Sequence, residues 1–195
     1  MDDRFRYDAD REARSAARVR ALEALLIQKG IITGKTVDTV VDFFETKMGP
    51  FNGAKVVARA WGDPYFKGRL VEDTPKAIAE LSLGEGMAGA EGEHMRAVAN
   101  GPEVHNLIIC TLCSCYPWPV LGQPPYWYKD PTFRSRAARE PRAVLAEFGG
   151  DVPAPVEIKV WDSSAQIRWF VVPQRPAGTD GFTESAMLRQ DHGAG

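Results

Sequence analysis

The sequence predicts an α+β fold in which helices come first, strands follow, and a helical arm lies at the N-terminus. Two observations lead to this prediction. Apolar residues in the first half of the chain recur at helical spacing, whereas short runs of alternating or continuous apolar residues gather in the second half. The first helical segment is also unusually charged. We therefore expect an arm over residues 1–50 and one globular domain over residues 51–195.

Composition limits the classes of function. The chain has 195 residues and is 44% hydrophobic, which is enough for one core with an appended helix. A net charge of -2, with acidic and basic residues interspersed, gives no basic surface for nucleic acid. The first residues are too charged for a signal peptide, and no apolar run approaches the ~20 residues of a membrane span. We expect a cytoplasmic protein that binds neither nucleic acid nor membranes.

The first predicted helix runs from Asp8 to Lys29, and Gly30 ends it. Its charged first half is solvated or lies on another subunit, and we favour the subunit. A short amphipathic helix follows before the breaker Gly49-Pro50, with its apolar residues at Val37, Val40, Val41 and Phe44. Another apolar face consists of Val56, Val57, Ala60 and Trp61.

Two short helices should come next, because Asp63-Pro64 and Thr74-Pro75 each place a capping residue before a proline at the first helical position. Residues 84–92 are punctuated by glycine but lack the strand-turn-helix context of a nucleotide-binding loop. They are predicted to be a loop or a bulged edge.

The second half of the chain predicts strands and one further helix. Residues 103–110 end in an apolar run, which predicts a buried strand that delivers Cys110 at its end, while His105 makes an ordinary core or edge contact. Pro141 opens a helix that Gly149 ends. The alternating residues 156–160 predict a strand, and residues 167–172 are predicted to be its antiparallel return.

All three cysteines lie within the six residues Cys110-Thr111-Leu112-Cys113-Ser114-Cys115. The Cys113 sulfur, the peptide nitrogens of Ser114 and Cys115, and the Cys115 sulfur can chelate one metal ion through five- and six-membered rings. Cys110 can add a third thiolate on one side, which leaves one position open for water or substrate. Thiolates and ionised amides suit a low-spin trivalent cobalt or iron ion better than zinc, whose structural sites are tetrahedral.

Three other interpretations of the cysteines compete with a chelated trivalent ion. A disulfide framework is disfavoured because three cysteines cannot pair off. Unrelated buried thiols would usually be scattered through the core. A zinc site completed by His105 stays open, since Cys-x-x-Cys with a nearby histidine is a common zinc pattern. In that case the chain would be a non-enzymatic zinc-binding module.

Residues 104–122, which surround the cysteines, resemble the metal-binding segment of nitrile hydratase alpha subunits. Thr111 resembles the cobalt-type version, because the iron type usually has serine there. The resemblance covers most of the chain and includes residues 60–67, 124–129, 139–142, 160–164 and 173–179. It implies layered helices and sheets around a metal-binding loop, and it makes residues 51–195 a metal-binding catalytic domain.

The resemblance also implies chemistry and partners. Nitriles would be hydrated to amides at a non-corrin cobalt(III) ion acting as a Lewis acid, with iron(III) the less favoured metal. Cys113 would become a sulfinate and Cys115 a sulfenate, while Cys110 stays a thiolate. The implied partners are a beta subunit, an activator protein that inserts the metal, and a small-molecule nitrile, with a third subunit left open. A related thiocyanate hydrolase is the alternative enzyme.

The site residues that the resemblance implies are the metal ligands Cys110, Cys113, Ser114 and Cys115, with Cys115 and Ser114 also catalytic. Either the Cys115 sulfenate or a hydroxide would attack the nitrile. Four residues are expected around the loop: Glu91, Trp118, Asp162 and Arg168. Glu91 could equally be a solvated carboxylate, and Trp118 could equally pack in the core.

Three features depart from the family pattern. Gln166 replaces a usual glutamate, Gln123 replaces a frequent leucine, and the tail after Phe182 lacks the apolar ending of the family. Because Gln166 has no carboxylate, any carboxylate role at this position is in doubt. The tail and Gln123 point to a three-subunit branch that acts on a bulky nitrile such as a nucleoside.

Overall fold

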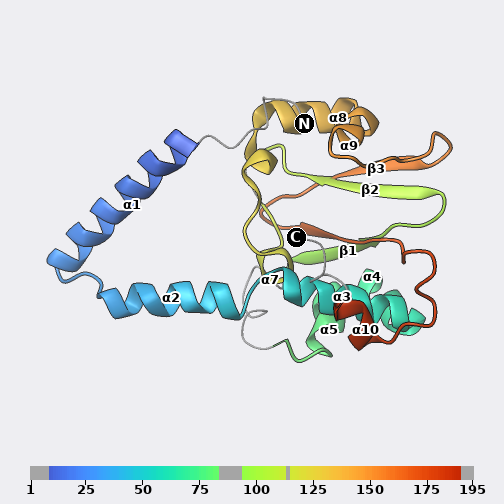
Figure 1. Cartoon of the computed structure of the whole chain (residues 1–195), viewed down its shortest axis with the longest axis horizontal. Helices are drawn as coiled ribbons and strands as arrows, with labels where there is room; N and C mark the ends of the chain where they lie inside the picture. Colours follow the sequence, from blue (N-terminus) through green and yellow to red (C-terminus); the bar gives the residue numbers. More distant parts are fainter. Residues whose placement is uncertain (1–8, 84–93, 113–114, 190–195) are drawn as a thin grey trace.

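The computed structural model describes residues 9–83, 94–112 and 115–189, and it has the predicted α+β class. Its body has four layers (Figure 1). Helices α8 (Pro131–Arg139) and α9 (Pro141–Glu147) cover one pair of strands, and helices α3 (Pro50–Gly62), α4 (Pro64–Glu72), α5 (Thr74–Ala79) and α10 (Glu184–Arg189) lie beyond the other pair. The two pairs of strands lie between the helical layers.

Each strand pair is a small parallel sheet. Strand β1 (Met95–Ala99) pairs with β4 (Arg168–Val172), and β2 (Val104–Ile109) pairs with β3 (Glu157–Asp162). The predicted antiparallel pairing of residues 156–160 with 167–172 is therefore wrong. The chain crosses from one sheet to the other between β3 and β4. The Ser163 amide still donates to the Ile109 carbonyl of β2 at 2.7 Å, whereas the Arg168 amide donates to the His94 carbonyl beside β1 at 2.9 Å.

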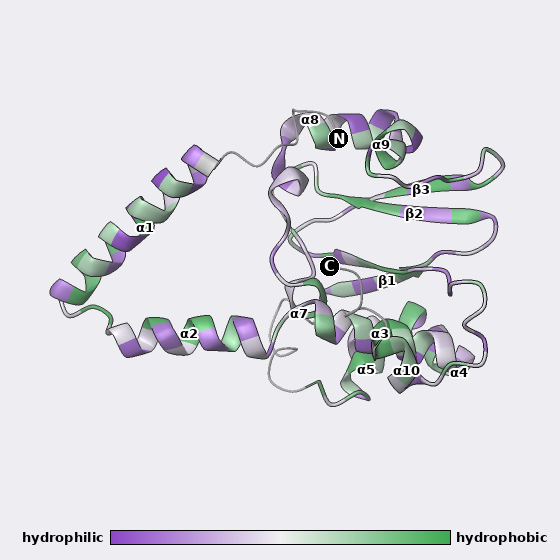
Figure 2. Ribbon diagram, viewed as in Figure 1, coloured by the Kyte–Doolittle hydropathy of each residue, from purple (hydrophilic) through white to green (hydrophobic). Residues whose placement is uncertain are grey.

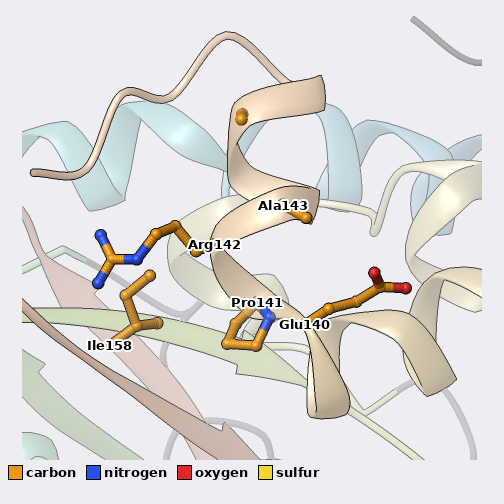
Figure 3. A pocket seen from close by; sticks show the side chains of 6 residues that line it. Glu140, Pro141, Arg142, Ala143 and Ile158 are labelled. Atoms are coloured by element: carbon orange, nitrogen blue, oxygen red, sulfur yellow. The ribbon is translucent and has the colours of Figure 1, made fainter. Parts of the chain in front are cut away.

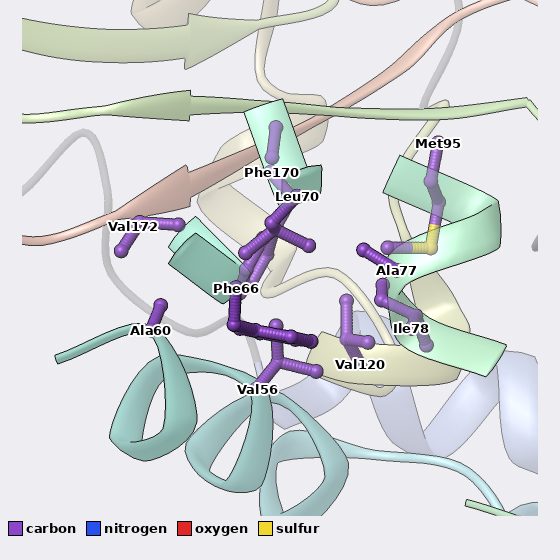
Figure 4. Close-up of a cluster of buried hydrophobic side chains, with 11 residues drawn as sticks. Val56, Ala60, Phe66, Leu70, Ala77, Ile78, Met95, Val120, Phe170 and Val172 are labelled. Atoms are coloured by element: carbon purple, nitrogen blue, oxygen red, sulfur yellow. The ribbon is translucent and has the colours of Figure 1, made fainter. Parts of the chain in front are cut away.

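Two buried clusters form the core. The larger one lies between the β1–β4 sheet and the helices beyond it, and Figure 4 shows its members: Val56, Ala60, Phe66, Leu70, Ala77, Ile78, Met95, Ala97, Val120, Phe170 and Val172. The second cluster lies between the β2–β3 sheet and α8 and α9, and it consists of Ile109, Cys110, Tyr128, Phe133, Ala137 and Val144. The first cysteine therefore belongs to the second cluster.

The predicted helix starts are largely confirmed. Asp63 caps α4 by accepting hydrogen bonds from the Tyr65 and Phe66 amides, both at 3.0 Å. For α5 the predicted cap is wrong, because Asp73 is the capping residue and accepts from the Lys76 amide at 3.3 Å. The hydroxyl of Thr74 is used elsewhere: it donates to the Leu70 carbonyl at 2.8 Å and accepts from the Ala97 amide of β1 at 2.6 Å.

The N-terminal helices extend away from the body (Figure 1). Helix α1 (Ala9–Gln28) agrees with the predicted helix, and α2 (Gly34–Thr46) agrees with the predicted amphipathic one. Apolar and polar residues alternate around both helices (Figure 2). Apolar side chains of α1 are exposed: Val19 is 64% exposed and Leu22 is 57% exposed. Within the described residues, α2 has no buried side chain.

The remaining helices include the predicted one at Pro141, which is α9 and ends before Gly149 at a φ of 80°. Short helices α7 (Trp118–Leu121) and η3 (Tyr126–Lys129) follow the cysteine segment. The glycine-punctuated residues 84–92 lie outside the described residues. In the described ranges, no helix has the length and apolar character needed to cross a membrane.

Candidate metal centre

Two of the three cysteines lie in one cluster at the end of β2. Cys110 directly follows this strand and is fully buried. Cys115 is half-buried and packs against the same cluster, whose members include Tyr128 and Phe133. The two cysteines at the ends of the segment therefore share one apolar cluster. Cys113 and Ser114, which were predicted as ligands, lie outside the described residues.

Asp162 holds the beginning of the cysteine segment. It is the last residue of β3 and lies opposite Ile109 in the register of the two strands. Its carboxylate accepts from the Thr111 amide at 2.9 Å and from the Thr111 hydroxyl at 2.5 Å. A carboxylate with two acceptor atoms thus fixes both the backbone and the side chain of the residue that follows Cys110. The structure brings this predicted residue to the loop.

Tyr128 holds the other end of the segment. It lies in η3, is 2% exposed, and donates its hydroxyl hydrogen bond to the Cys115 carbonyl at 3.0 Å. Burial raises the pKa of Tyr128 well above its usual value, the charge of Cys110 raises this pKa further, and a hydrogen bond with Ser163 opposes the rise. The phenol is therefore a protonated donor at neutral pH.

No pattern in the residues singles out Tyr128. Residues 124–129 contain two prolines and three aromatic or phenolic side chains, and an irregular segment of this kind has no periodicity from which to infer which side chain is buried. The proline pair Pro124-Pro125 is the one feature that could have pointed to Tyr128, because prolines restrict how the chain enters the next segment. Pro125 has an extended φ and ψ immediately before the short helix, so it sets the direction in which Tyr128 enters the core.

Aromatic rings pack together on the C-terminal side of the segment. Tyr116 packs edge-on against Tyr128 with ring centroids 5.0 Å apart, and Tyr128 lies near Phe133 and Trp127. Trp118 is half-buried, and its ring meets Phe44 of α2 at a centroid distance of 5.6 Å. One described contact of Trp118 is therefore to the N-terminal helices. Such rings exclude water from one side of the loop.

For the other two residues expected around the loop, Arg168 and Glu91, the prediction stays untested, and Gln166 is described with them. Arg168 opens β4, and one guanidinium nitrogen donates to the Ala165 carbonyl at 2.9 Å, within the crossing between the sheets. Gln166 is exposed, and its side-chain oxygen lies 3.3 Å from the Ser164 hydroxyl. Glu91 lies outside the described residues.

His105 makes the ordinary contact that was predicted. Its ring is 3.5 Å from the Asn100 amide nitrogen, and burial lowers the pKa of His105 below its usual value. It stands five residues before Cys110. An extended strand rises about 3.3 Å per residue, which separates the two residues by about 16 Å along β2. This spacing argues against a zinc site made from His105 and the cysteines.

Metal-ligating side chains do not cluster elsewhere in the described part of the chain. Among residues 9–83, 94–112 and 115–189, no three or more His, Cys, Asp or Glu side chains come together to hold a metal. The third cysteine, Cys113, is not among these residues, so the cysteine segment itself remains the candidate.

The arginine-rich approach to α9 has internal partners. Arg136 forms ion pairs with Glu140 at 2.8 Å and with Glu147 at 2.5 Å. Arg142 donates to the Val152 carbonyl at 2.5 Å and to the Val156 carbonyl at 2.6 Å. The Arg136–Glu147 pair joins α8 to α9, and the Arg142 bonds attach α9 to the loop before β3.

An open hollow of about 670 Å³ lies beside α9. It is lined by Glu140, Pro141, Arg142, Ala143, Ala146 and Ile158 (Figure 3). None of these lining residues belongs to the cysteine segment or contacts it in the hydrogen bonds described above, so the hollow is not part of the candidate centre.

Comparisons with known proteins agree with the geometry. The family model described as nitrile hydratase, alpha chain, matches residues 13–190. The low-molecular weight cobalt-containing nitrile hydratase subunit alpha of Rhodococcus rhodochrous is 54% identical over 172 residues, which cover 88% of this chain and 81% of that protein. The thiocyanate hydrolase subunit gamma of Thiobacillus thioparus is 39% identical over 174 residues, covering 86% of this chain and 71% of that protein.

A solved structure shares the fold. A double mutant of the Fe-type nitrile hydratase from Comamonas testosteroni Ni1 superimposes with a TM-score of 0.81 at 37% sequence identity, and the match covers 93% of this chain and 85% of that one.

Proposed function

This chain belongs to the nitrile hydratase alpha-chain family, and on that premise we propose that it is the metal-bearing subunit of a cobalt-type nitrile hydratase. The reaction is the addition of water across R–C≡N to give the amide R–C(=O)NH2. The observation that carries the proposal is the cysteine segment. Cys110 and Cys115 pack in one cluster, and Asp162 and Tyr128 hold the two ends of the segment.

Cys110, Cys113 and Cys115 would hold the metal through sulfur, and Ser114 and Cys115 would do so through their peptide nitrogens. A buried thiol at a strand end and a second one in the same cluster fit an ion that prefers soft donors. Bound cobalt(III) would supply Lewis acidity at this position. Cobalt is favoured over iron because the cobalt-containing relative is 54% identical and the Fe-type structure only 37% identical.

The chain's own residues prepare this position. Asp162 fixes the Thr111 backbone, and Tyr128 fixes the Cys115 carbonyl, so both ends of the segment are held in place. The surrounding aromatic rings limit the access of water. We assign to Cys113 a sulfinate and to Cys115 a sulfenate, whose oxygens would accept hydrogen bonds or attack the nitrile carbon. Glu91, Trp118 and Arg168 remain candidates for contacts around the loop.

The exposed arm supports a partner. Several apolar side chains of α1 and α2 are exposed, among them Val19, Leu22, Val40 and Val41, and exposed apolar surface of this kind marks interaction sites. We propose that residues 1–50 lie on a beta subunit and that residues 51–195 form the catalytic domain. A third subunit and a metal-inserting activator protein belong to the same proposal.

A thiocyanate hydrolase is the second candidate, because the gamma subunit of such an enzyme is 39% identical to this chain. The assay that separates the two uses the chain co-expressed with its partner subunits in cobalt medium. Amide formation from nitriles, with little turnover of thiocyanate, is expected. Preferential turnover of thiocyanate would replace the proposal with the second candidate. Cys115→Ala serves as the inactive reference and His105→Ala as the active one.

A further inference from the structure

A chain of hydrogen bonds runs from the start of β4 to the cysteine segment. The Trp169 amide donates to the Ser163 hydroxyl at 3.3 Å, and the Tyr128 hydroxyl donates to the Cys115 carbonyl at 3.0 Å. Between them, the Ser163 and Tyr128 hydroxyls share a hydrogen bond. The single hydroxyl proton of Tyr128 already goes to the Cys115 carbonyl, so the Ser163 hydroxyl is the donor in this bond.

Both hydroxyls in this chain are enclosed by the core. Ser163 is 1% exposed and Tyr128 is 2% exposed. Ser163 is itself fixed by its amide, which donates to the Ile109 carbonyl at the end of β2 at 2.7 Å. Each hydroxyl therefore donates in one direction and accepts from the other, and successive bonds of this kind strengthen one another. The direction runs from the sheets toward Cys115.

We propose that Tyr128 is a positioning residue for the metal-bearing loop, and that it acts by holding the Cys115 carbonyl. The inference rests on the proposed function, because it assigns Tyr128 a role toward the bound cobalt. The carbonyl carbon, the nitrogen and the Cβ of Cys115 are all bonded to one Cα. A carbonyl held in place limits how this Cα turns, and it thereby limits where the Cys115 nitrogen and sulfur point.

The position of Tyr128 complements that of Asp162. Asp162 acts on Thr111, next to the first ligand, whereas Tyr128 acts on Cys115, the last one. Both are attached to the end of β3, Asp162 as its final residue and Tyr128 through Ser163, which follows. Residues at the end of β3 therefore hold both ends of the cysteine segment.

The test is Tyr128→Phe in the cobalt-loaded chain assembled with its partner subunits, because this change removes one hydroxyl and keeps the ring. Tyr126→Phe is the matched control: it makes the same change in the same η3, at a residue that is 42% exposed. Three quantities are measured: the rate of cobalt release to excess chelator, the sulfur-to-cobalt charge-transfer absorption, and the unfolding temperature of the metal-free chain. Ser163→Ala removes the donor to Tyr128 and serves if Tyr128→Phe fails to fold.

We expect Tyr128→Phe to release cobalt about 10- to 100-fold faster, the usual effect of losing a group that orients metal ligands. Its charge-transfer band should shift, and Ser163→Ala should change both quantities less and in the same direction. Release at the wild-type rate with an unshifted band would overturn the inference, as would an equal effect in Tyr126→Phe. Lower stability of the metal-free chain with unchanged cobalt release would also overturn it. A wild-type chain that binds no cobalt overturns the proposed function instead.

Discussion

At the scale of single residues, the geometry of the loop depends on a few polar contacts made by buried or strand-end side chains. Asp162 is the clearest case, because one carboxylate accepts two hydrogen bonds from Thr111. Its place at the end of β3 explains why it reaches the loop: its register partner, Ile109, immediately precedes Cys110. Two strands that end together thus bring a carboxylate and a cysteine to the same edge.

Removing these contacts should loosen the metal. We expect Asp162→Ala to release cobalt about tenfold faster, at the low end of the range for groups that orient metal ligands, because the carboxylate is exposed. Thr111→Val should have a smaller effect, since it removes only the hydroxyl contact. Asp63→Ala removes a carboxylate that also accepts two hydrogen bonds, at the start of α4 rather than at the cysteine segment, and serves as the control. Chelator competition measures all three, and equal release by Asp162→Ala and the wild type would contradict this role.

Residue types alone predicted part of this site. Three cysteines in six positions have few explanations other than a metal, and Asp162 followed from the family pattern. Tyr128 and Ser163 were not found, because their roles depend on burial and on hydroxyl directions. No spacing in the sequence encodes these properties. His105 shows the converse: its spacing fits zinc, yet an extended strand carries it away from the cysteines.

At the scale of elements, Thr74 ties helices α4 and α5 to strand β1. Its hydroxyl donates to the Leu70 carbonyl and accepts from the Ala97 amide, and the residue has no exposed surface. The sequence predicted a cap at this threonine because threonine before proline is a frequent helix start. Asp73 is the capping residue instead, so the Thr74 hydroxyl is free to accept a hydrogen bond from the buried Ala97 amide of β1.

Thr74→Val should therefore destabilise the protein although it preserves shape. The change leaves the buried Ala97 amide without its acceptor, and such a group costs about 1–3 kcal/mol. Thr39→Val is the matched control, because the Thr39 hydroxyl donates to the Lys35 carbonyl on the exposed surface of α2. Urea unfolding of the metal-free variants gives both free energies. Equal stability of Thr74→Val and the wild type would show that water or a backbone shift satisfies the amide.

The strands illustrate what sequence patterns leave open. Positions 156–160 and 167–172 were correctly identified as strands from their apolar residues. Their pairing was not, because periodicity reports which face is buried and says nothing about the neighbouring strand. Each strand joined an earlier partner, β2 or β1, and two hydrogen bonds at residues 163 and 168 mark the crossing. The crossing matters for function, since it carries Asp162 and Ser163 at the end of β3.

At the scale of the whole molecule, the N-terminal helices expose apolar surface that a partner subunit could cover. The body buries two apolar clusters of its own, whereas helices α1 and α2 leave apolar side chains exposed. Burial of apolar surface is the main driving force for stable association, so these helices favour a partner subunit. A site with oxidised cysteines would also concentrate negative charge, and buried anions need cationic hydrogen-bond donors.

The isolated chain should therefore bind cobalt yet hydrate nitriles poorly. One preorganised electrostatic donor can change turnover by roughly two to three orders of magnitude, and we expect a rise of this size when the partner subunits are present. Leu22→Asn, on the exposed apolar face of α1, should weaken this rise, whereas Arg20→Asn should not. Steady-state kinetics with and without the partners measure the effect. Equal turnover in both samples would mean that the chain is self-sufficient.

X-ray absorption at the metal of the purified holoprotein tests the central claim most directly. The claim is that one cobalt ion is held by Cys110, Cys113, Cys115 and the peptide nitrogens between the last two cysteines. We expect a cobalt edge, scattering from sulfur and light-atom donors, and no scattering from an imidazole ring. The spectrum should be unchanged in His105→Ala, and the cobalt should be lost in Cys115→Ala. A zinc edge with imidazole scattering that disappears in His105→Ala would contradict the account.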